Sequence, residues 1–265
     1  MDAVVEQKEK PFCWNLGAKK IGILSGVDAS APTVYKALIA AGYEPIRRQK
    51  SRHLKRYAKP ASNDQWNIDF VEIGVDTVTG KKIESLSVTD DHSRFTFSTD
   101  ATTEATTEHV IDVLERLFRF YGKPRVIHSD HGSQWYSTSS GVSRFDIWCQ
   151  DNGIKHTMAP IRTPECNGKV ERYHGCLRVE ADLPAEGTVE DYRDILLRYR
   201  DFFNNHRPNC SLDYRTPAET YNKTYECERD RKEHDRLLAI YRGREHASET
   251  GVGSAEARSI FRELK

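Results

Sequence analysis

The middle of the chain is dominated by short apolar segments rich in β-branched and aromatic residues. The first, residues 66–75 (WNIDFVEIGV), ends before a turn at Thr79-Gly80-Lys81 and predicts a strand. Four further segments have the same character, and they cover residues 82–89, 94–99, 125–129 and 154–158. The first three predicted strands follow one another through short turns, which favours an antiparallel arrangement.

Between and after the later strands, the apolar residues have helical spacing. Apolar positions recur at intervals of three and four in the predicted helices, which cover residues 103–121, 145–152, 167–180 and 189–205. The order is three strands, helix, strand, helix, strand and helices. This order predicts an α/β fold, with a mixed five-stranded sheet and helices on both faces.

Two short helices are predicted before the sheet, around a break at residues 26–28. In the second, residues 32–41, Val34, Leu38 and Ile39 have helical spacing and form the predicted inner face. Three side chains near its start would face outward and could contact DNA: Thr33, Tyr35 and Lys36. We interpret the pair as a helix-turn-helix, although any small helical hairpin gives the same pattern.

Composition adds a charge argument. The 265 residues carry no net charge, so bulk charge does not indicate a nucleic-acid partner. However, residues 47–59 hold seven Lys or Arg residues and no acid, as in many phosphate-contacting arms and also in some linkers without a partner. The predicted DNA-contacting residues of this segment are Arg47, Arg48, Lys50, Arg52, Lys55 and Arg56.

The remaining composition limits the class of protein. None of the six cysteines forms a C-x-x-C pair, which argues against a structural zinc site. No apolar stretch approaches the length of a membrane span or a secretory leader, so we expect a cytoplasmic protein with reduced thiols. The predicted organisation is a helix-turn-helix region (1–45), a basic linker (46–64), a core (65–221) and a charged helical tail (222–265).

Three acids stand out by their positions. Asp69 lies inside an apolar strand, where a carboxylate without a partner or metal is costly. Asp130 directly follows a predicted strand, and Glu171 lies in the first turns of a predicted helix. Each position alone has an ordinary structural explanation, and only their convergence would make a site for two divalent metal ions.

The segments around these acids resemble a known family. WNIDF, HSDHGSQW and PECNGKVERYHG resemble the three motifs of the retroviral-integrase-like DDE superfamily, as found in prokaryotic insertion-sequence transposases. VTDDHSRF and FNNHRPNCSLDYRTPAETY resemble two more family segments, in the same order along residues 66–221. The resemblance implies a ribonuclease-H-like fold, with Asp69, Asp130 and Glu171 as the catalytic, metal-binding triad for two Mg²⁺ or Mn²⁺ ions.

The resemblance also implies DNA contacts near the triad, at Asn167, Lys169 and Arg172. The sequence departs from the family in two ways. The segment between Asp130 and Glu171 is longer than usual, and we assign the surplus to residues 136–143, keeping Glu171 rather than Glu165 as the third acid. Only one helix-turn-helix fits before residue 66, so either this lineage is compact or the reading frame is truncated and needs a second protein for full end recognition.

The function implied by the resemblance is a DNA transposase that cleaves element ends and joins them to target DNA. Its expected partners are double-stranded DNA, as transposon ends and target, and further copies of the chain, with a location at the prokaryotic nucleoid. Two alternatives stay open, a ribonuclease-H-like nuclease and a catalytically inactive, domesticated DNA-binding regulator. His131 and His174 lie near the acids, and we expect neither to transfer protons, since the metals would activate the hydroxyl.

Overall fold

The computed structural model describes residues 1–44, 58–132, 135, 142–159 and 168–221. Its centre is a mixed sheet in the order β3-β2-β1-β4-β5. The five strands are β1 (Gln65–Asp76), β2 (Lys82–Asp90), β3 (Thr96–Thr102), β4 (Val126–Ser129) and β5 (Lys155–Met158). A two-residue strand, β6 (Glu186–Gly187), also pairs with β1, so the predicted five-stranded sheet is confirmed with one short addition.

The pairing pattern follows from the connections. β1, β2 and β3 are antiparallel neighbours joined by short turns, while β4 and β5 are parallel to β1 and are reached through helices. Asp76 closes the β1–β2 turn, because its carboxylate accepts hydrogen bonds from the backbone N–H and hydroxyl of Thr79. The central strand β1 therefore has partners on both sides, which fixes the register of its side chains.

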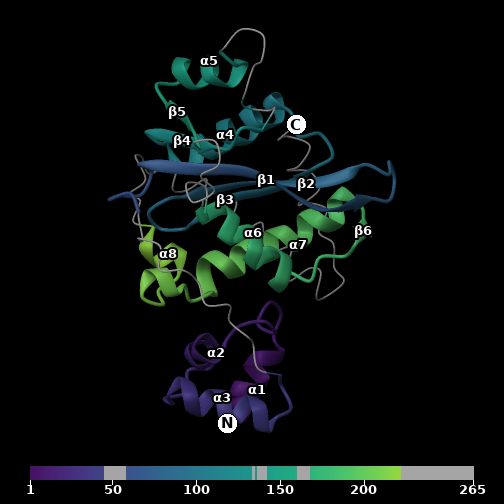
Figure 1. Ribbon diagram of the computed structural model, residues 1–265, viewed down its shortest axis with the longest axis vertical. Helices are drawn as coiled ribbons and strands as arrows, with labels where there is room; N and C mark the ends of the chain where they lie inside the picture. The colour runs from purple at the N-terminus through teal and green to yellow at the C-terminus, as the bar shows by residue number, and fades with distance from the viewer. Residues whose placement is uncertain (45–57, 133–134, 136–141, 160–167, 222–265) are drawn as a thin grey trace, which may run out of the picture. The chain divides into compact units, whose positions relative to one another are not determined.

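Figure 1 shows helices on both faces of the sheet, as the sequence predicts. α6 (Gly168–Glu180) and α7 (Val189–Asp201) cover one face. The first part of α4 (Thr107–Tyr121) and α5 (Arg144–Asp151) lie on the other side of the sheet. A π-helical turn (Phe202–His206), a 3-10 turn (Cys210–Leu212) and α8 (Pro217–Thr220) follow α7.

The face covered by α6 and α7 holds a large aromatic core. Tyr173 and Leu177 of α6, Tyr192 and Tyr199 of α7 and Ile83 of β2 are all buried there. Gly74 of β1 permits the close approach of Tyr192, because a Cβ at this glycine would lie 1.7 Å from the tyrosine hydroxyl oxygen. This packing holds α6 firmly against the centre of the sheet.

Three short helices precede the sheet: α1 (Asp2–Glu9), α2 (Ala18–Ser25) and α3 (Ala31–Ala40). They surround a small core of buried side chains, made of Val4, Cys13, Leu16, Ile21, Val34 and Leu38. Gly26 directly follows α2, and its φ of 66° suits a residue without a side chain, while Ser30 caps α3. The two predicted helices are confirmed, whereas α1 lacks the apolar spacing that would have predicted it.

Two boundary predictions and one burial prediction are wrong. α4 begins at Thr107 rather than 103, because the Thr106 hydroxyl accepts a hydrogen bond from the N–H of His109. β3 begins at Thr96 rather than 94, because Arg94 has a φ of 65° in the turn after β2. Ile39, assigned to the inner face of α3, is 40% exposed.

Some predictions fall on residues outside the described ranges. These are the basic segment from Arg47 to Arg56, Asn167, Glu165 and the tail from residue 222. Residues 1–114 and the described residues from 123 onward form one compact unit. None of the helices in the described part of the chain combines the length and apolarity needed to cross a membrane.

Candidate active site

Asp69 lies on β1, and Asp130 directly follows β4, the parallel neighbour of β1. The register of β1 and β4 ends with the pair Asn67 and His128, two residues before Asp69 on β1 and two residues before Asp130, which is the first residue after β4. Neighbouring strands are about 4.8 Å apart and paired positions point to the same face. The charge of Asp130 acts on Asp69, so the two carboxylates share one region, and the contact of Asp69 with His174 places this region beside α6.

Asp130 is held by donors on one of its two carboxylate oxygens. Oδ1 accepts hydrogen bonds from the N–H of Gly132 (2.9 Å) and from the indole Nε1 of Trp135 (2.8 Å). Trp135 is buried, and its ring stacks on Phe70 with centroids 6.0 Å apart. These contacts fix the carboxylate while it stays partly open to solvent, as a ligand for a cation needs to be.

Asp69 has an unusual charge environment. Burial and the negative charge of Asp130 raise the pKa of Asp69 to about 7, and the charge of Glu171 adds to the effect. A hydrogen bond from the N–H of Phe70 opposes this rise. The interaction of Asp69 with both other acids indicates that the three predicted carboxylates share one region, with too little positive charge to compensate them.

Glu171 lies on the exposed side of the first turn of α6. Partial burial raises the pKa of Glu171 above its usual value. One turn further along the same helix, the Nδ1 atom of His174 lies 3.7 Å from an Asp69 carboxylate oxygen. Residues three apart lie on one side of a helix. This contact therefore indicates that the side of α6 that carries Glu171 lies beside Asp69.

His174 does not compensate the charge of Asp69. Burial lowers the pKa of His174 to about 3, so the ring is neutral at pH 7 and its contact with Asp69 is not an ion pair. The distance of 3.7 Å is also too long for a hydrogen bond. His131 is directed elsewhere, since its Nε2 lies 2.6 Å from the carbonyl oxygen of Ala159.

Lys169, in contrast, has a carboxylate partner. Its ammonium group contacts Asp91 at the start of the β2–β3 turn. Burial alone would raise the pKa of Asp91, but hydrogen bonds from Lys169 and from the N–H of Lys59 outweigh burial and hold the pKa below its usual range. Asn67 donates a further hydrogen bond at 3.3 Å. Asp91 is therefore a fully compensated buried carboxylate.

The donor set suits a hard divalent cation. Asp69, Asp130 and Glu171 offer only carboxylate oxygens, which Mg²⁺ and Mn²⁺ prefer over nitrogen or sulfur. Among the described residues, no three Asp, Glu, His or Cys side chains already stand close enough to hold an ion. A cation would offset the repulsion that raises the pKa of Asp69 and would draw the carboxylates together.

Comparison with known proteins decides the family. Two models of an integrase core domain match the chain, one over residues 59–164 and one over residues 152–217. Together they cover more than half of the chain and include all three acids. The chain belongs to the integrase core domain family.

Relatives of this integrase core protein come from bacterial insertion elements. An uncharacterized 31.7 kDa protein of insertion element IS407 from Burkholderia multivorans is 26% identical over 200 residues, which cover 73% of this chain and 70% of the relative. A 39.2 kDa protein of insertion element IS476 from Xanthomonas euvesicatoria is 26% identical over 192 residues, 70% of this chain and 54% of the relative. The chain thus spans about half the length of the second relative.

A solved structure supports the fold of the integrase core. A chain of the simian T-cell lymphotropic virus intasome, in complex with PP2A regulatory subunit B56 gamma, superposes with a TM-score of 0.52. The two chains are 18% identical, and the match covers 81% of this chain and 73% of the other. This likeness confirms the predicted ribonuclease-H-like α/β fold.

The described residues predicted to contact DNA have different surroundings. Thr33, Tyr35 and Lys36 are all exposed on α3, as predicted. Arg172 is exposed on α6. The Lys169 side chain is only 18% exposed and forms an ion pair with Asp91. Asn167 lies outside the described residues, so the structure does not place it.

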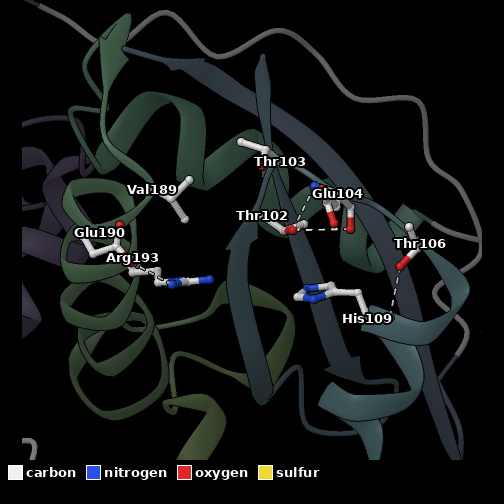
Figure 2. Close-up of a pocket in the computed structure, with 8 residues that line it drawn as sticks. All are labelled: Thr102, Thr103, Glu104, Thr106, His109, Val189, Glu190 and Arg193. Carbon is white, nitrogen blue, oxygen red and sulfur yellow. Dashed lines mark hydrogen bonds and ion pairs between the residues drawn. The ribbon is translucent and has the colours of Figure 1, made fainter. Parts of the chain in front are cut away.

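A separate hollow of about 360 Å³ lies where β3, the start of α4 and α7 meet. Figure 2 shows His109 and Arg193 pointing toward one another across the hollow. Both contact Asp100, with the His109 Nε2 at 3.3 Å and the Arg193 Nε at 3.7 Å from its carboxylate. None of the three predicted acids lines this hollow, so it is distinct from the candidate active site.

Sequence reasoning missed several residues around the acids. Trp135 donates a hydrogen bond to Asp130, five residues before it in the sequence. Asp91 contacts Lys169, which lies 78 residues later. Ser129 Oγ contacts His156 Nε2, and His156 Nδ1 contacts Asp146, although the three residues come from different elements. The position of His156 on a strand paired with β4 was the only available signal, and it did not identify its partners.

Proposed function

We propose that this integrase core protein is a DNA transposase that cleaves transposon ends and transfers them to target DNA. The observation that carries the proposal is the rise in the pKa of Asp69, caused by burial and by the charges of Asp130 and Glu171. Carboxylates with strongly perturbed pKa values cluster at functional sites, and three carboxylates in one region are a donor set that suits Mg²⁺ or Mn²⁺. Membership of the integrase core family supports the same chemistry.

Asp69, Asp130 and Glu171 would together hold two Mg²⁺ or Mn²⁺ ions. When bound, such ions activate the attacking water or 3′-hydroxyl and stabilise the charge on the leaving oxygen. The protein contributes rigid placement: strand pairing positions Asp69, and Gly132 and Trp135 orient Asp130. His174, neutral and buried, would exclude water behind Asp69 without acting as a base.

DNA would be bound by regions outside the acid cluster. The exposed side chains of α3 are proposed to contact the transposon end, and the basic segment 47–56 to contact phosphates. Arg172, exposed one residue after Glu171, is proposed to contact the scissile strand. We further propose that several copies of the chain act together on paired ends, in the cytoplasm of a prokaryotic cell.

The test uses purified protein, labelled DNA that carries the element's own ends, and Mg²⁺ or Mn²⁺. We expect metal-dependent strand joining by the wild type, loss of joining in Asp130→Asn, and retention in Asp151→Asn, which changes an exposed acid of α5. Hydrolysis without joining would support a ribonuclease-H-like nuclease instead. DNA binding without any cleavage would support an inactive regulator.

A further inference from the structure

Behind Asp130, three side chains form a continuous series of hydrogen bonds. The Ser129 hydroxyl oxygen lies 2.9 Å from His156 Nε2, and His156 Nδ1 lies 2.5 Å from Asp146 Oδ1. The same hydroxyl lies 2.9 Å from the carbonyl oxygen of Asp130. The series therefore connects the first turn of α5, through β5, to the backbone of a predicted metal ligand.

The order Ser, His, Asp is that of a serine hydrolase, but burial excludes a nucleophilic role. Ser129 is completely buried, and the side chain of His156 is only 4% exposed. No substrate carbonyl could reach the Ser129 hydroxyl without unfolding β4, and a nucleophile has to contact its substrate. Asp146 can only accept, and the single hydroxyl hydrogen of Ser129 is donated to Asp130. Both ring nitrogens of His156 therefore act as donors, and the orientation of the ring is fixed.

Asp130 needs such support because it lies beyond the end of β4. The ladder between β4 and β5 ends with the hydrogen bond from the N–H of Ala159 to the carbonyl oxygen of Ser129. One residue later, strand pairing no longer fixes the peptide of Asp130, and its carbonyl oxygen needs another donor. The Ser129 hydroxyl supplies this donor.

Asp146 is a rigid anchor for the series. Its Oδ2 atom accepts hydrogen bonds from the N–H (2.9 Å) and hydroxyl (2.7 Å) of Ser143, which form the capping box of α5. Its Oδ1 atom is left for His156. One carboxylate thus begins the helix and orients the histidine ring at the same time.

A second connection reaches Asp130 from the same helical turn. Trp135, which donates to the Asp130 carboxylate, packs edge to face on Phe145 with centroids 5.2 Å apart. Phe145 in turn packs edge to face on His156, with centroids 4.9 Å apart. The backbone and the carboxylate of Asp130 are therefore both held by contacts that lead to Phe145 and Asp146 at the start of α5.

We propose that Asp146 and His156 are positioning residues for metal binding at Asp130, acting through Ser129. The proposal rests on the proposed function only for the identity of Asp130 as a metal ligand. Removing either side chain would free the peptide of Asp130 and widen the range of orientations of its carboxylate. Partners that orient a metal ligand typically contribute 10- to 100-fold in metal affinity or activity.

Two matched alanine variants separate this role from helix capping. Asp146→Ala removes a capping-box acid that also holds a histidine, and Asp191→Ala removes the equivalent acid of the Thr188 capping box on α7. His156→Ala provides a second, independent disruption of the series. For each full-length variant, calorimetry would measure the dissociation constant for Mn²⁺ without DNA, at a temperature well below its Tm.

We expect Asp146→Ala and His156→Ala to raise the Mn²⁺ dissociation constant about 10-fold, and Asp191→Ala to leave it within about twofold of the wild type. The Mg²⁺ concentration for half-maximal DNA cleavage should rise in parallel. Unchanged Mn²⁺ binding in folded His156→Ala would overturn the proposal, as would an equal loss in Asp191→Ala. Mn²⁺ binding that follows the expected order without any DNA cleavage would reject the proposed function and leave the positioning role supported.

Discussion

Asp91, which is buried, and Asp69, which is partly buried, lie beside the same helix, α6, with opposite electrostatic environments. Asp91 accepts hydrogen bonds from the ammonium group of Lys169, a backbone N–H and the side-chain amide of Asn67. Its pKa lies below the usual range. Asp69 faces two further acids, and its pKa rises to about 7. The protein itself compensates the first charge and leaves the second for something else to compensate.

This difference suggests how structural and functional acids can be distinguished in one site. A carboxylate whose donors come from the protein stabilises the fold, since removing it leaves those donors unpaired. A carboxylate that the fold places among like charges destabilises the protein until a cation binds. Asp91 and Asp69 are therefore expected to respond in opposite ways to substitution, as the predictions below require.

The largest effect on activity should come from substitution of Glu171, the predicted metal ligand on α6 whose charge adds to the rise in the pKa of Asp69. We expect Glu171→Gln to reduce DNA strand transfer at least about 1000-fold, because losing a metal ligand removes several kcal/mol of transition-state stabilisation. Glu165→Gln is the control and should retain activity. If Glu165→Gln abolishes transfer while Glu171→Gln does not, the third acid has been assigned to the wrong residue.

The next largest effect concerns the stability of the protein and the compensated carboxylate, Asp91. Asp91→Ala should lower the free energy of unfolding by about 3 kcal/mol, because it leaves the buried Lys169 ammonium without its partner. Burial also lowers the pKa of Lys169, so the ion pair itself contributes less than this cost. In urea denaturation, a second change, Lys169→Met, should recover much of the loss. Equal stability of Asp91→Ala and wild type would contradict the assignment.

Substitution of Asp69, in contrast, is expected to raise the free energy of unfolding of the metal-free protein. A raised pKa means that the folded protein holds this proton more tightly than the unfolded chain, so stability is lost as the pH rises from about 4 to about 7. We expect Asp69→Asn to stabilise the protein by about 2 kcal/mol at pH 8, half of what about 1.4 kcal/mol per pKa unit would give, because the group is partly solvated. The gain should vanish near pH 4 in chemical denaturation, and a gain independent of pH would reject this explanation.

The smallest effect concerns whether Lys169 contacts DNA or only Asp91. Arg52→Ala, in the basic segment, should reduce the slope of log binding constant against log salt concentration by about 0.9, as expected for one lost phosphate contact. Lys169→Met should leave the slope unchanged, because Asp91 already occupies the ammonium group. A slope reduced equally by both variants would show that Lys169 exchanges Asp91 for phosphate when DNA binds.

The succession of strands and helices along the chain was predictable because its signals are local, and the three acids were selected on signals of the same kind. An acid inside an apolar strand, as at Asp69, and an acid directly after a strand, as at Asp130, are visible within ten residues of sequence. Helix α6 is equally clear, since its buried residues Val170, Tyr173 and Leu177 have helical spacing.

The contacts that orient these acids were not predictable, because each joins distant segments. The donor to Asp91 lies 78 residues away on α6, and His156 contacts partners 27 residues before and 10 residues before it. Such pairs depend on the register of β4 and β5 and on helix packing, which the periodicity of a single segment does not determine. The first helix, α1, was missed for a different reason, since its only buried residues are Val4 and Lys8.

The most direct test of the central claim is calorimetric titration of Mn²⁺ into the metal-free protein at pH 8. Wild type, Asp69→Asn and Asp91→Asn would be compared at a temperature where all three are folded. The account predicts that wild type and Asp91→Asn bind Mn²⁺ with similar affinity and that Asp69→Asn does not bind it measurably. Wild-type affinity in Asp69→Asn, or an equal loss in Asp91→Asn, would contradict the account.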